Sequence, residues 1–349
     1  MPAGRCPILP PLFPARGDGA GWGDQPRIQR RSDLNSFRTL AVAASLRLAW
    51  LACLACLACA LAAPAAAQQP GFAFLEVPGG ARAAALGGAY ASVARGAEAA
   101  FWNPAGLAKF DGTQLSATHT ETYEHLRHEQ VALAGRLLGG GLATSLRAMY
   151  SEPIPERDEF GNLTGSFGAH DLEFLLGYGR ATAGGASYGL TAQIVRERIA
   201  DLAATTWAMG AGAAWDLGIL PGARASVSLH NVGPSGHYLI DGEQGQPVRL
   251  PTALQLGVSL AHATFENLTG LLAIEGRATR GRRALLSVGG ELESPVGAAL
   301  RFGLRSGDDV ATWSAGAGWK SGALHVDYAF IPSRLELDDT HRFSLSADF

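Results

Sequence analysis

A serine and a histidine stand two residues apart at Ser228 and His230, and they are the nearest approach in this chain to a nucleophile with its base. A phospholipase built on a membrane barrel would need a serine, a histidine and a polar partner on adjoining strands. Ser228 and His230 fall on the same predicted strand, and no third group stands out beside them. We therefore predict that the chain is not an enzyme.

The cysteines are confined to the beginning of the chain, at Cys6, Cys53, Cys56 and Cys59. A mature protein that starts after Ala67 would contain none, which excludes a cysteine-based zinc site, a disulfide framework and a cysteine nucleophile. No acidic cluster has EF-hand spacing. We interpret the remaining candidate ligands as solvated loop residues, namely Asp308-Asp309, Asp338-Asp339, His125 and His128. The sequence thus predicts no metal and no cofactor.

The charge balance argues against nucleic acid as a partner. Residues 1–67 hold seven of the 28 basic and three of the 31 acidic residues, so the remainder has 21 basic and 28 acidic residues and a net charge of −7. Nucleic-acid binding would require a basic surface instead. One predicted outer turn is basic and either contacts lipopolysaccharide phosphates or is simply a charged turn; it contains Arg277, Arg280, Arg282 and Arg283.

Residues 1–67 have the layout of an amino-terminal extension followed by a secretory signal peptide. Arg38 begins a short basic region, residues 40–63 are almost entirely apolar, and small residues at 65–67 precede a cleavage site that we predict near Ala67. A membrane anchor formed by the same apolar run and lipidation at Cys59 are the alternatives. No stretch after Ala67 approaches the 18 apolar residues of a spanning helix.

Period-two alternation of apolar and small residues recurs along the rest of the chain. Residues 207–215 are typical, with Trp207, Met209 and Trp215 on one face and Ala or Gly on the other. Such stretches span about ten residues, the length of a tilted membrane strand, whereas strands of soluble β-sandwiches are shorter. Fourteen strands are predicted, starting near Thr113, Gln130, Gly141, Asp171, Ser187, Ala204, Ala223, Thr252, Leu268, Arg283, Ala298, Ala311, Ala323 and Thr340.

The connections between the predicted strands differ in length. The three longest, at 152–170, 231–251 and 332–339, all follow odd-numbered strands, and the connections after even-numbered strands are tight. Short periplasmic turns and longer outer loops are the asymmetry of outer-membrane barrels. The sequence therefore predicts an all-β fold, an antiparallel transmembrane β-barrel of about fourteen strands over residues 113–349, located in the cell outer membrane.

The carboxyl-terminal strand alternates and ends in Phe349. This ending resembles the signal that barrel-assembly machinery reads, so we predict that Phe349 is an assembly signal. Leu345 lies on the same predicted face as Phe343 and Phe349, and we assign that face to lipid. The expected partners are outer-membrane lipid, lipopolysaccharide and the assembly machinery.

Residues 68–112 belong neither to the signal nor to the strands. They contain the strings Ala-Arg-x-x-x-Leu-Gly-Gly-Ala at 81–89 and Phe-x-Asn-Pro-Ala-Gly-Leu at 101–107. These strings resemble the outer-membrane family that includes PorV and PorQ, within the FadL-like class of fatty-acid-transporter barrels. The resemblance covers about forty residues and implies a fourteen-stranded barrel with an amino-terminal helical or irregular plug. It identifies no ligand-contacting residues.

The residue types in these strings have a physical meaning of their own. Pro104 excludes the αR conformation for Asn103 and fixes a turn, and Arg82 is suited to pair with a carboxylate in the lumen. Glycines permit close packing and positive φ. A plug held by packing alone and a plug that gates or binds a ligand are both compatible with the candidate residues, which are Arg82, Leu86, Gly87, Gly88, Asn103, Pro104, Ala105 and Gly106.

The resemblance leaves two function classes open. The fatty-acid class implies transport of hydrophobic small molecules, whereas PorV-like members act with the type IX secretion machinery, which implies that the barrel handles secreted proteins. Lumen polarity should discriminate between them, but the predicted inward positions are mixed. Among many small residues they include Arg147, Glu173, Gln193, Arg196, Glu275, Glu291 and Arg301.

Overall fold

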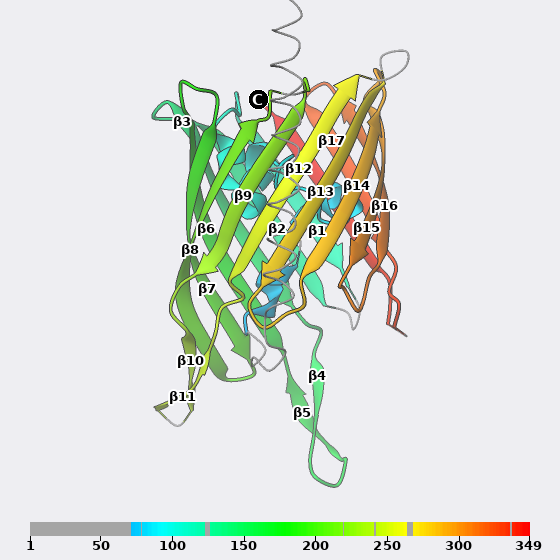
Figure 1. The fold of residues 1–349 in the computed structure, drawn as a ribbon. Helices are drawn as coiled ribbons and strands as arrows, with labels where there is room; N and C mark the ends of the chain where they lie inside the picture. Colours follow the sequence, from blue (N-terminus) through cyan, green and yellow to red (C-terminus); the bar gives the residue numbers. More distant parts are fainter. Residues whose placement is uncertain are drawn as a thin grey trace, which may run out of the picture. The chain divides into compact units, whose positions relative to one another are not determined.

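The barrel wall is a single antiparallel sheet that closes on itself (Figure 1). The computed structural model describes residues 71–77, 79–122, 126–218, 220–240, 242–263, 268–335 and 337–349, which belong to one unit, Ser45–Phe349. The predicted signal peptide with its cleavage point near Ala67, the four cysteines and His125 lie outside these residues.

Within the described residues, fourteen strands follow one another around the ring. The ring closes where β1 (Gln114–Glu121) pairs with β18 (Thr340–Asp348). The other wall strands are β2 (Arg127–Leu137), β3 (Gly140–Tyr150), β6 (Ala169–Ala181), β7 (Ser187–Ile199), β8 (Leu202–Asp216), β9 (Ala223–Val232), β12 (Ala253–Ala263), β13 (Thr269–Thr279), β14 (Leu285–Glu293), β15 (Ala298–Ser306), β16 (Trp313–Ser321) and β17 (Leu324–Ile331). The predicted fold class and strand number are confirmed.

Two of the predicted loops are wrong in part, because each contains a hairpin. Strands β4 (Ile154–Arg157) and β5 (Leu163–Phe167) lie between β3 and β6, and β10 (Gly236–Ile240) and β11 (Glu243–Val248) lie between β9 and β12. Both hairpins project from the same end of the barrel (Figure 1). We call this the long-loop end, and the opposite end, with the tight turns and Phe349, the short-turn end.

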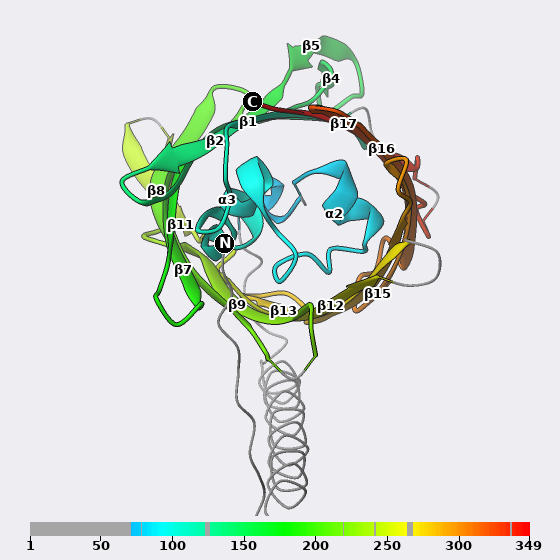
Figure 2. The same cartoon turned by 90° about the horizontal axis from the view of Figure 1, so that it is seen from above.

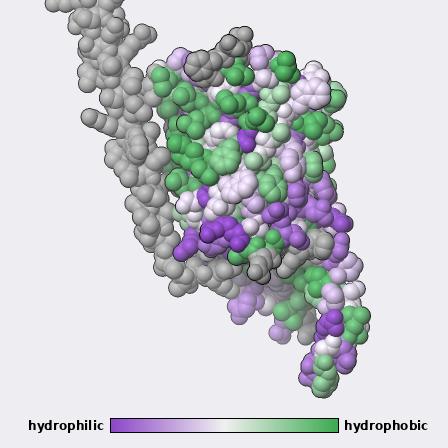
Figure 3. All heavy atoms as spheres, turned by 90° about the vertical axis from the view of Figure 1, so that its right-hand side faces the viewer, coloured by the Kyte–Doolittle hydropathy of each residue, from purple (hydrophilic) through white to green (hydrophobic). Residues whose placement is uncertain are grey.

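The two faces of the wall differ as membrane exposure requires. Leu172 and Phe174 are each 47% exposed on the outside, while Glu173 between them is 2% exposed and faces the lumen. Figure 3 shows hydrophobic residues gathered over one side of the wall and hydrophilic residues gathered toward the long-loop end. Arg196 was predicted to face inward, but it is exposed on the outward face of β7, next to the buried Val195.

Leu345 provides a test of the lipid-facing assignment. It is 52% exposed on β18 and pairs with Ala117 and Val326 of the neighbouring strands. We expect Leu345→Arg to destabilise the inserted barrel by about 2–4 kcal/mol, because a guanidinium near the bilayer midplane loses its hydration. Reduced levels of the heat-modifiable, folded form on gels would report this. Leu335→Arg is the control, since Leu335 is equally exposed but lies in the β17–β18 loop; equal loss for both variants would contradict the assignment.

Phe349 lies at the seam of the barrel. Its N–H donates to the carbonyl of Thr113, and its carbonyl accepts from the N–H of Thr113, at 2.8 and 3.2 Å. The side chain of Phe349 is 80% exposed. The last residue of the chain thus extends the pairing of the first and last strands, while its predicted role as an assembly signal stays a prediction.

Between residue 71 and the first strand, the described residues form five short helices: η1 (Ala73–Glu76), α2 (Ala81–Ala85), η2 (Gly96–Glu98), α3 (Ala99–Trp102) and η3 (Pro104–Leu107). No helix in the described ranges is long and apolar enough to cross a membrane. Figure 2 shows α2 and α3 inside the ring of strands. We call residues 71–112 the plug.

The plug passes through the lumen from one end of the barrel to the other. At the long-loop end, the N–H of Phe72 donates to Glu197 at 2.7 Å and Glu76 pairs with Arg282 at 3.2 Å. Toward the short-turn end, Lys109 pairs with Asp216 at 3.0 Å. Because β1 starts at the short-turn end, the lumen must hold the whole intervening segment.

Candidate functional site

The first plug motif docks on glycines of the wall. Helix α2 packs against β15, β16, β17 and β18. It ends at Ala85 and is followed by a turn with Gly87 and Gly88, whose φ angles of 67° and 83° suit glycine. A Cβ atom on Gly303 would lie only 2.1 Å from the nitrogen of Gly87, and one on Gly289 2.6 Å from the carbonyl oxygen of Leu86. The inward glycines therefore form a recess that fits the Leu86–Gly88 turn.

The second plug motif docks in the same way on another part of the wall. Asn103 has φ −162° and ψ 106°, the extended conformation predicted for a residue before proline, and its Oδ1 accepts from the N–H of Ala105 at 3.0 Å. Its Nδ2 donates to the carbonyl of Ala213 on β8 at 3.2 Å. An amide is needed at Asn103, because one end accepts to cap η3 and the other donates to the wall.

Wall glycines also leave room for the rest of this motif. Cβ atoms on Gly179 and Gly189 would lie 2.4 Å from the Pro104 carbonyl group, and one on Gly212 would lie 2.1 Å from Asn103 Oδ1. Gly106 itself leaves no space for a side chain, since its Cβ would lie 2.2 Å from the Ala94 carbonyl oxygen. Its role is close packing within the plug.

A chain of charges fastens the plug to the wall. Arg82 donates from Nε and Nη2 to both oxygens of Glu291, at 2.8 and 2.6 Å, which makes the ion pair expected of Arg82 with a lumen carboxylate. Arg301 on β15 also donates to Glu291 and, through Nη1, to Asp327 on β17 at 2.6 Å. The Glu291 and Arg301 side chains are only 4% and 6% exposed, so their charges depend on each other.

Other lumen side chains hold backbone groups of the plug. Oε2 of Glu275 accepts from the N–H groups of Tyr90 and Ala91 at 3.0 and 2.6 Å. Ser228 Oγ and His230 Nε2 lie 2.9 Å apart and both hydrogen-bond the Trp102 carbonyl, at 3.1 and 3.0 Å. The Ser228–His230 pair is therefore placed as a plug anchor.

Three expectations for charged residues need correction. His128 was predicted in a solvated loop, but it is 1% exposed on β2, because that strand begins at Arg127. Asp308 was predicted as solvated, but it is half-buried and pairs with Arg305 at 2.7 Å. The predicted lipopolysaccharide cluster is divided, because Arg277 lies on the lumen side of β13 and Arg282 pairs with the plug residue Glu76.

A cavity of about 590 Å³ lies at the long-loop end, between the plug and the wall. The plug contributes residues of η1, the turn Gly87-Gly88 and Trp102 to its lining. The wall contributes residues of β12, β13, β14, β15, β17 and β18 and of the loops after β13 and β15. Val77, Leu285, Val310 and Ile331 supply apolar surface. Its volume falls in the range of small-molecule sites.

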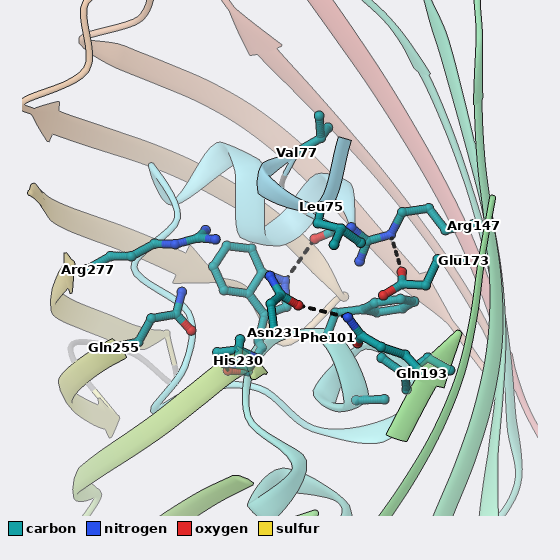
Figure 4. Close-up of a pocket in the computed structure, with 14 residues that line it drawn as sticks. Leu75, Val77, Phe101, Arg147, Glu173, Gln193, His230, Asn231, Gln255 and Arg277 are labelled. Carbon is teal, nitrogen blue, oxygen red and sulfur yellow. Dashed lines mark hydrogen bonds and ion pairs between the residues drawn. The ribbon is translucent and has the colours of Figure 1, made fainter. Parts of the chain in front are cut away.

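A second space of only about 30 Å³ adjoins this cavity, and Figure 4 shows the residues that line it. Both spaces are lined by Val77, Trp102, Gln255 and Arg277. The indole Nε1 of Trp102 donates to the Gly79 carbonyl at 3.0 Å and so joins two segments of the plug. Trp102 therefore lies at the boundary that the two spaces share.

The wall recess gives a prediction with an internal control. Gly289→Val should displace Leu86, because overpacking costs about 1–3 kcal/mol and the nearest plug atom is backbone. Gly290→Val, one residue further on β14, should be tolerated, since the nearest atom to its Cβ is 4.0 Å away. We expect higher ion leak through planar bilayers for the Gly289 variant alone. Equal leak in the two variants would show that the recess does not hold the plug.

Sequence reasoning placed the docking motifs inside the plug but missed part of the cavity. Arg305 and Arg342 line it and were not among the predicted inward residues. The signal for Arg305 was available, because it shares the parity of Arg301 and Gly303 on β15. Arg342 likewise shares the parity of the buried Ser344 on β18.

Residues 56–179 match an uncharacterised protein family, UPF0164. This region includes both plug motifs and the first three wall strands, and it is less than half of the chain. No curated protein matches the chain.

Several solved structures are similar to the barrel. A TodX deltaS2S3 mutant monoaromatic hydrocarbon channel aligns with a TM-score of 0.55 and 14% identity, over 77% of this chain and 99% of that one. The CymD monoaromatic hydrocarbon channel aligns at 0.51 and 13%, over 77% and 97%. A Pseudomonas aeruginosa FadL homologue aligns at 0.50 and 14%, also over 77% and 97%. The chain has the FadL-like barrel fold. At such low identities the likeness concerns the fold alone.

Proposed function

We propose that the protein is an outer-membrane barrel of the PorV/PorQ type that moves hydrophobic small molecules across the outer membrane. The observation that carries this proposal is a closed barrel that holds a cavity of about 590 Å³ between its wall and its plug, with Trp102 in the lining. The long-loop end then faces outward and the short-turn end faces the periplasm, in keeping with barrel asymmetry. The similarity to hydrocarbon channels supports the same proposal.

The plug motifs support a role in passage. Both strings that resemble the PorV/PorQ family contact recessed glycines of the wall, so the plug is docked at defined points. Fixed docking with small residues allows a local rearrangement at the Gly87-Gly88 turn without unfolding the barrel. Substrate would move from the outer cavity past Trp102 as this turn shifts.

Uptake of toluene by cells that carry the protein in their outer membrane tests the proposal. We expect faster uptake than in cells without the protein, and altered uptake for Gly88→Val, because Gly88 has a positive φ beside the cavity. Gly276→Val serves as the control, since its Cβ would meet no atom within 4 Å. Equal uptake with and without the protein would refute transport of this substrate class.

Handling of secreted proteins is a second candidate, which the β4–β5 hairpin favours. Phe160 and Leu163 are 80% and 66% exposed at its tip. The Asn162 side chain and nearby N–H groups donate to Asp158, fix the tip and hold the pKa of Asp158 below its usual range. Removing residues 154–167 should spare toluene uptake under the first function and should impair display of secreted proteins under the second.

A further inference from the structure

The outer cavity is unusual for a path that takes neutral hydrocarbons, because arginines line it. Five guanidinium groups come from β13, β15, β18 and the loop after β13, namely Arg277, Arg282, Arg283, Arg305 and Arg342. Four carboxylates share the lining, namely Glu76, Glu275, Asp308 and Asp309. What the cavity can bind depends on which of these arginines already have a carboxylate partner.

Three arginines have a carboxylate partner of their own. Arg282 pairs with Glu76 at 3.2 Å, Arg283 with Asp309 at 3.3 Å, and Arg305 with Asp308 at 2.7 Å. Arg342 is held differently, because its Nε donates to Thr120 Oγ1 at 2.8 Å. Glu275 is held by plug N–H groups instead. All four carboxylates are therefore engaged.

Among the described residues, Glu76 and Glu275 attract Arg277 only from beyond ion-pair distance. The Nε of Arg277 is buried and has no hydrogen-bond partner there, and no ion pair is formed within 4.0 Å. Figure 4 shows its side chain extending from the barrel wall toward the other residues that line the smaller space. Leaving the Nε of a partly buried guanidinium without a partner is costly, and an oxyanion that accepts from the group in bidentate fashion would reduce that cost.

The surroundings of Arg277 favour an anion that carries a compact apolar body. Trp102, Val77 and Leu285 line the same cavity. The adjoining space is only about 30 Å³, so the body must lie in the larger cavity. An aromatic ring suits this position, because it can pack against the indole while the charged group meets Arg277.

We propose that the outer cavity is a binding site for small organic anions, with Arg277 recognising the oxyanion and Trp102 contacting the apolar body. This deepens the proposed function by naming a substrate class, and it rests on that function only for the later passage past the plug. Neutral hydrocarbons such as toluene lack a group for Arg277, so they could pass through the cavity but would not be held at this site.

Calorimetric titration of the purified full-length protein in detergent tests the site with benzoate and benzamide, which share a ring and differ in charge. We expect benzoate to bind at least about tenfold more tightly, since hydrogen bonds to a charged group dominate the difference. Acetate should bind more weakly than benzoate, because it lacks the ring. Equal binding of benzamide and benzoate would overturn the role of charge, and equal binding of acetate would overturn the role of the body.

Substitutions at Arg277 test whether this residue causes the preference for benzoate. Arg277→Gln should lose about tenfold in benzoate affinity, Arg277→Lys should retain part of it, and Arg157→Gln on the exposed β4–β5 hairpin should bind normally. Unchanged benzoate affinity in folded Arg277→Gln would refute the proposal. If Arg277→Gln does not fold, the comparison of benzoate with benzamide on the unmodified protein still shows whether the site selects an anion.

Failure of this proposal and failure of the transport proposal give different results. Benzoate binding without accelerated toluene uptake would leave the anion site intact and refute hydrocarbon transport. Accelerated toluene uptake without selective benzoate binding would refute the anion site alone.

Discussion

A variant without residues 72–109 should conduct ions across planar bilayers, whereas the intact protein should be nearly closed. Fourteen strands enclose more space than wall side chains fill, since about eight strands already suffice for a packed interior. The inward wall residues are small, and Gly179, Gly189 and Gly303 each lie against plug backbone. Removing the plug replaces that backbone with water, so conductance should rise by roughly an order of magnitude or more.

Removal of residues 154–167 is the control for this deletion, because the β4–β5 hairpin projects beyond the rim (Figure 1). It should leave conductance low. Heat-modifiable migration on gels verifies that each barrel is closed. Equal, low conductance with and without the plug would remove the plug as the barrier and would leave the loops, above all the β10–β11 connection, as the closure.

The wall strands could be predicted from sequence because the residue pattern of each strand reflects the two environments that it faces. Lipid on one side and lumen on the other impose alternation within every strand, as Leu172, Glu173 and Phe174 illustrate. The hairpins β4–β5 and β10–β11 were not predicted, because neither of them packs against lipid or forms part of the barrel wall. The orientation of Arg196 was predicted wrongly, because a charged side chain near the end of a strand can face outward where the bilayer gives way to water.

The plug motifs could be located from sequence, but their contacts could not. Arg82 needs a carboxylate partner, and the sequence offers several inward carboxylates that could serve. Its selection of Glu291, 209 residues away, depends on the order and register of the closed sheet and on where α2 docks. The docking role of the wall glycines likewise becomes visible only when the plug backbone lies against them. Distance in sequence therefore limits prediction of the site more than residue type does.

Loss of the Glu291 charge should be among the most destabilising single changes in the barrel. Glu291 accepts from both Arg82 and Arg301, and Arg301 is 6% exposed at its side chain. Removing one member of a buried ionic group costs about 3–5 kcal/mol, because its partner stays buried without compensation. Glu291→Gln should therefore lower the free energy of unfolding in urea titrations by that amount and also loosen the plug, which raises ion leak.

Two matched variants separate these consequences. Arg82→Gln should raise ion leak with a smaller loss of stability, because Arg301 keeps both Glu291 and Asp327 and the wall network survives. Glu293→Gln, two residues further along β14, should change neither property, since no ion pair to Glu293 is formed within the described residues. If Glu291→Gln and Arg82→Gln lose equal stability, Glu291 acts through the plug alone. If Glu291→Gln is neutral, the guanidinium groups are stabilised by water, and the charge chain is not what fastens the plug.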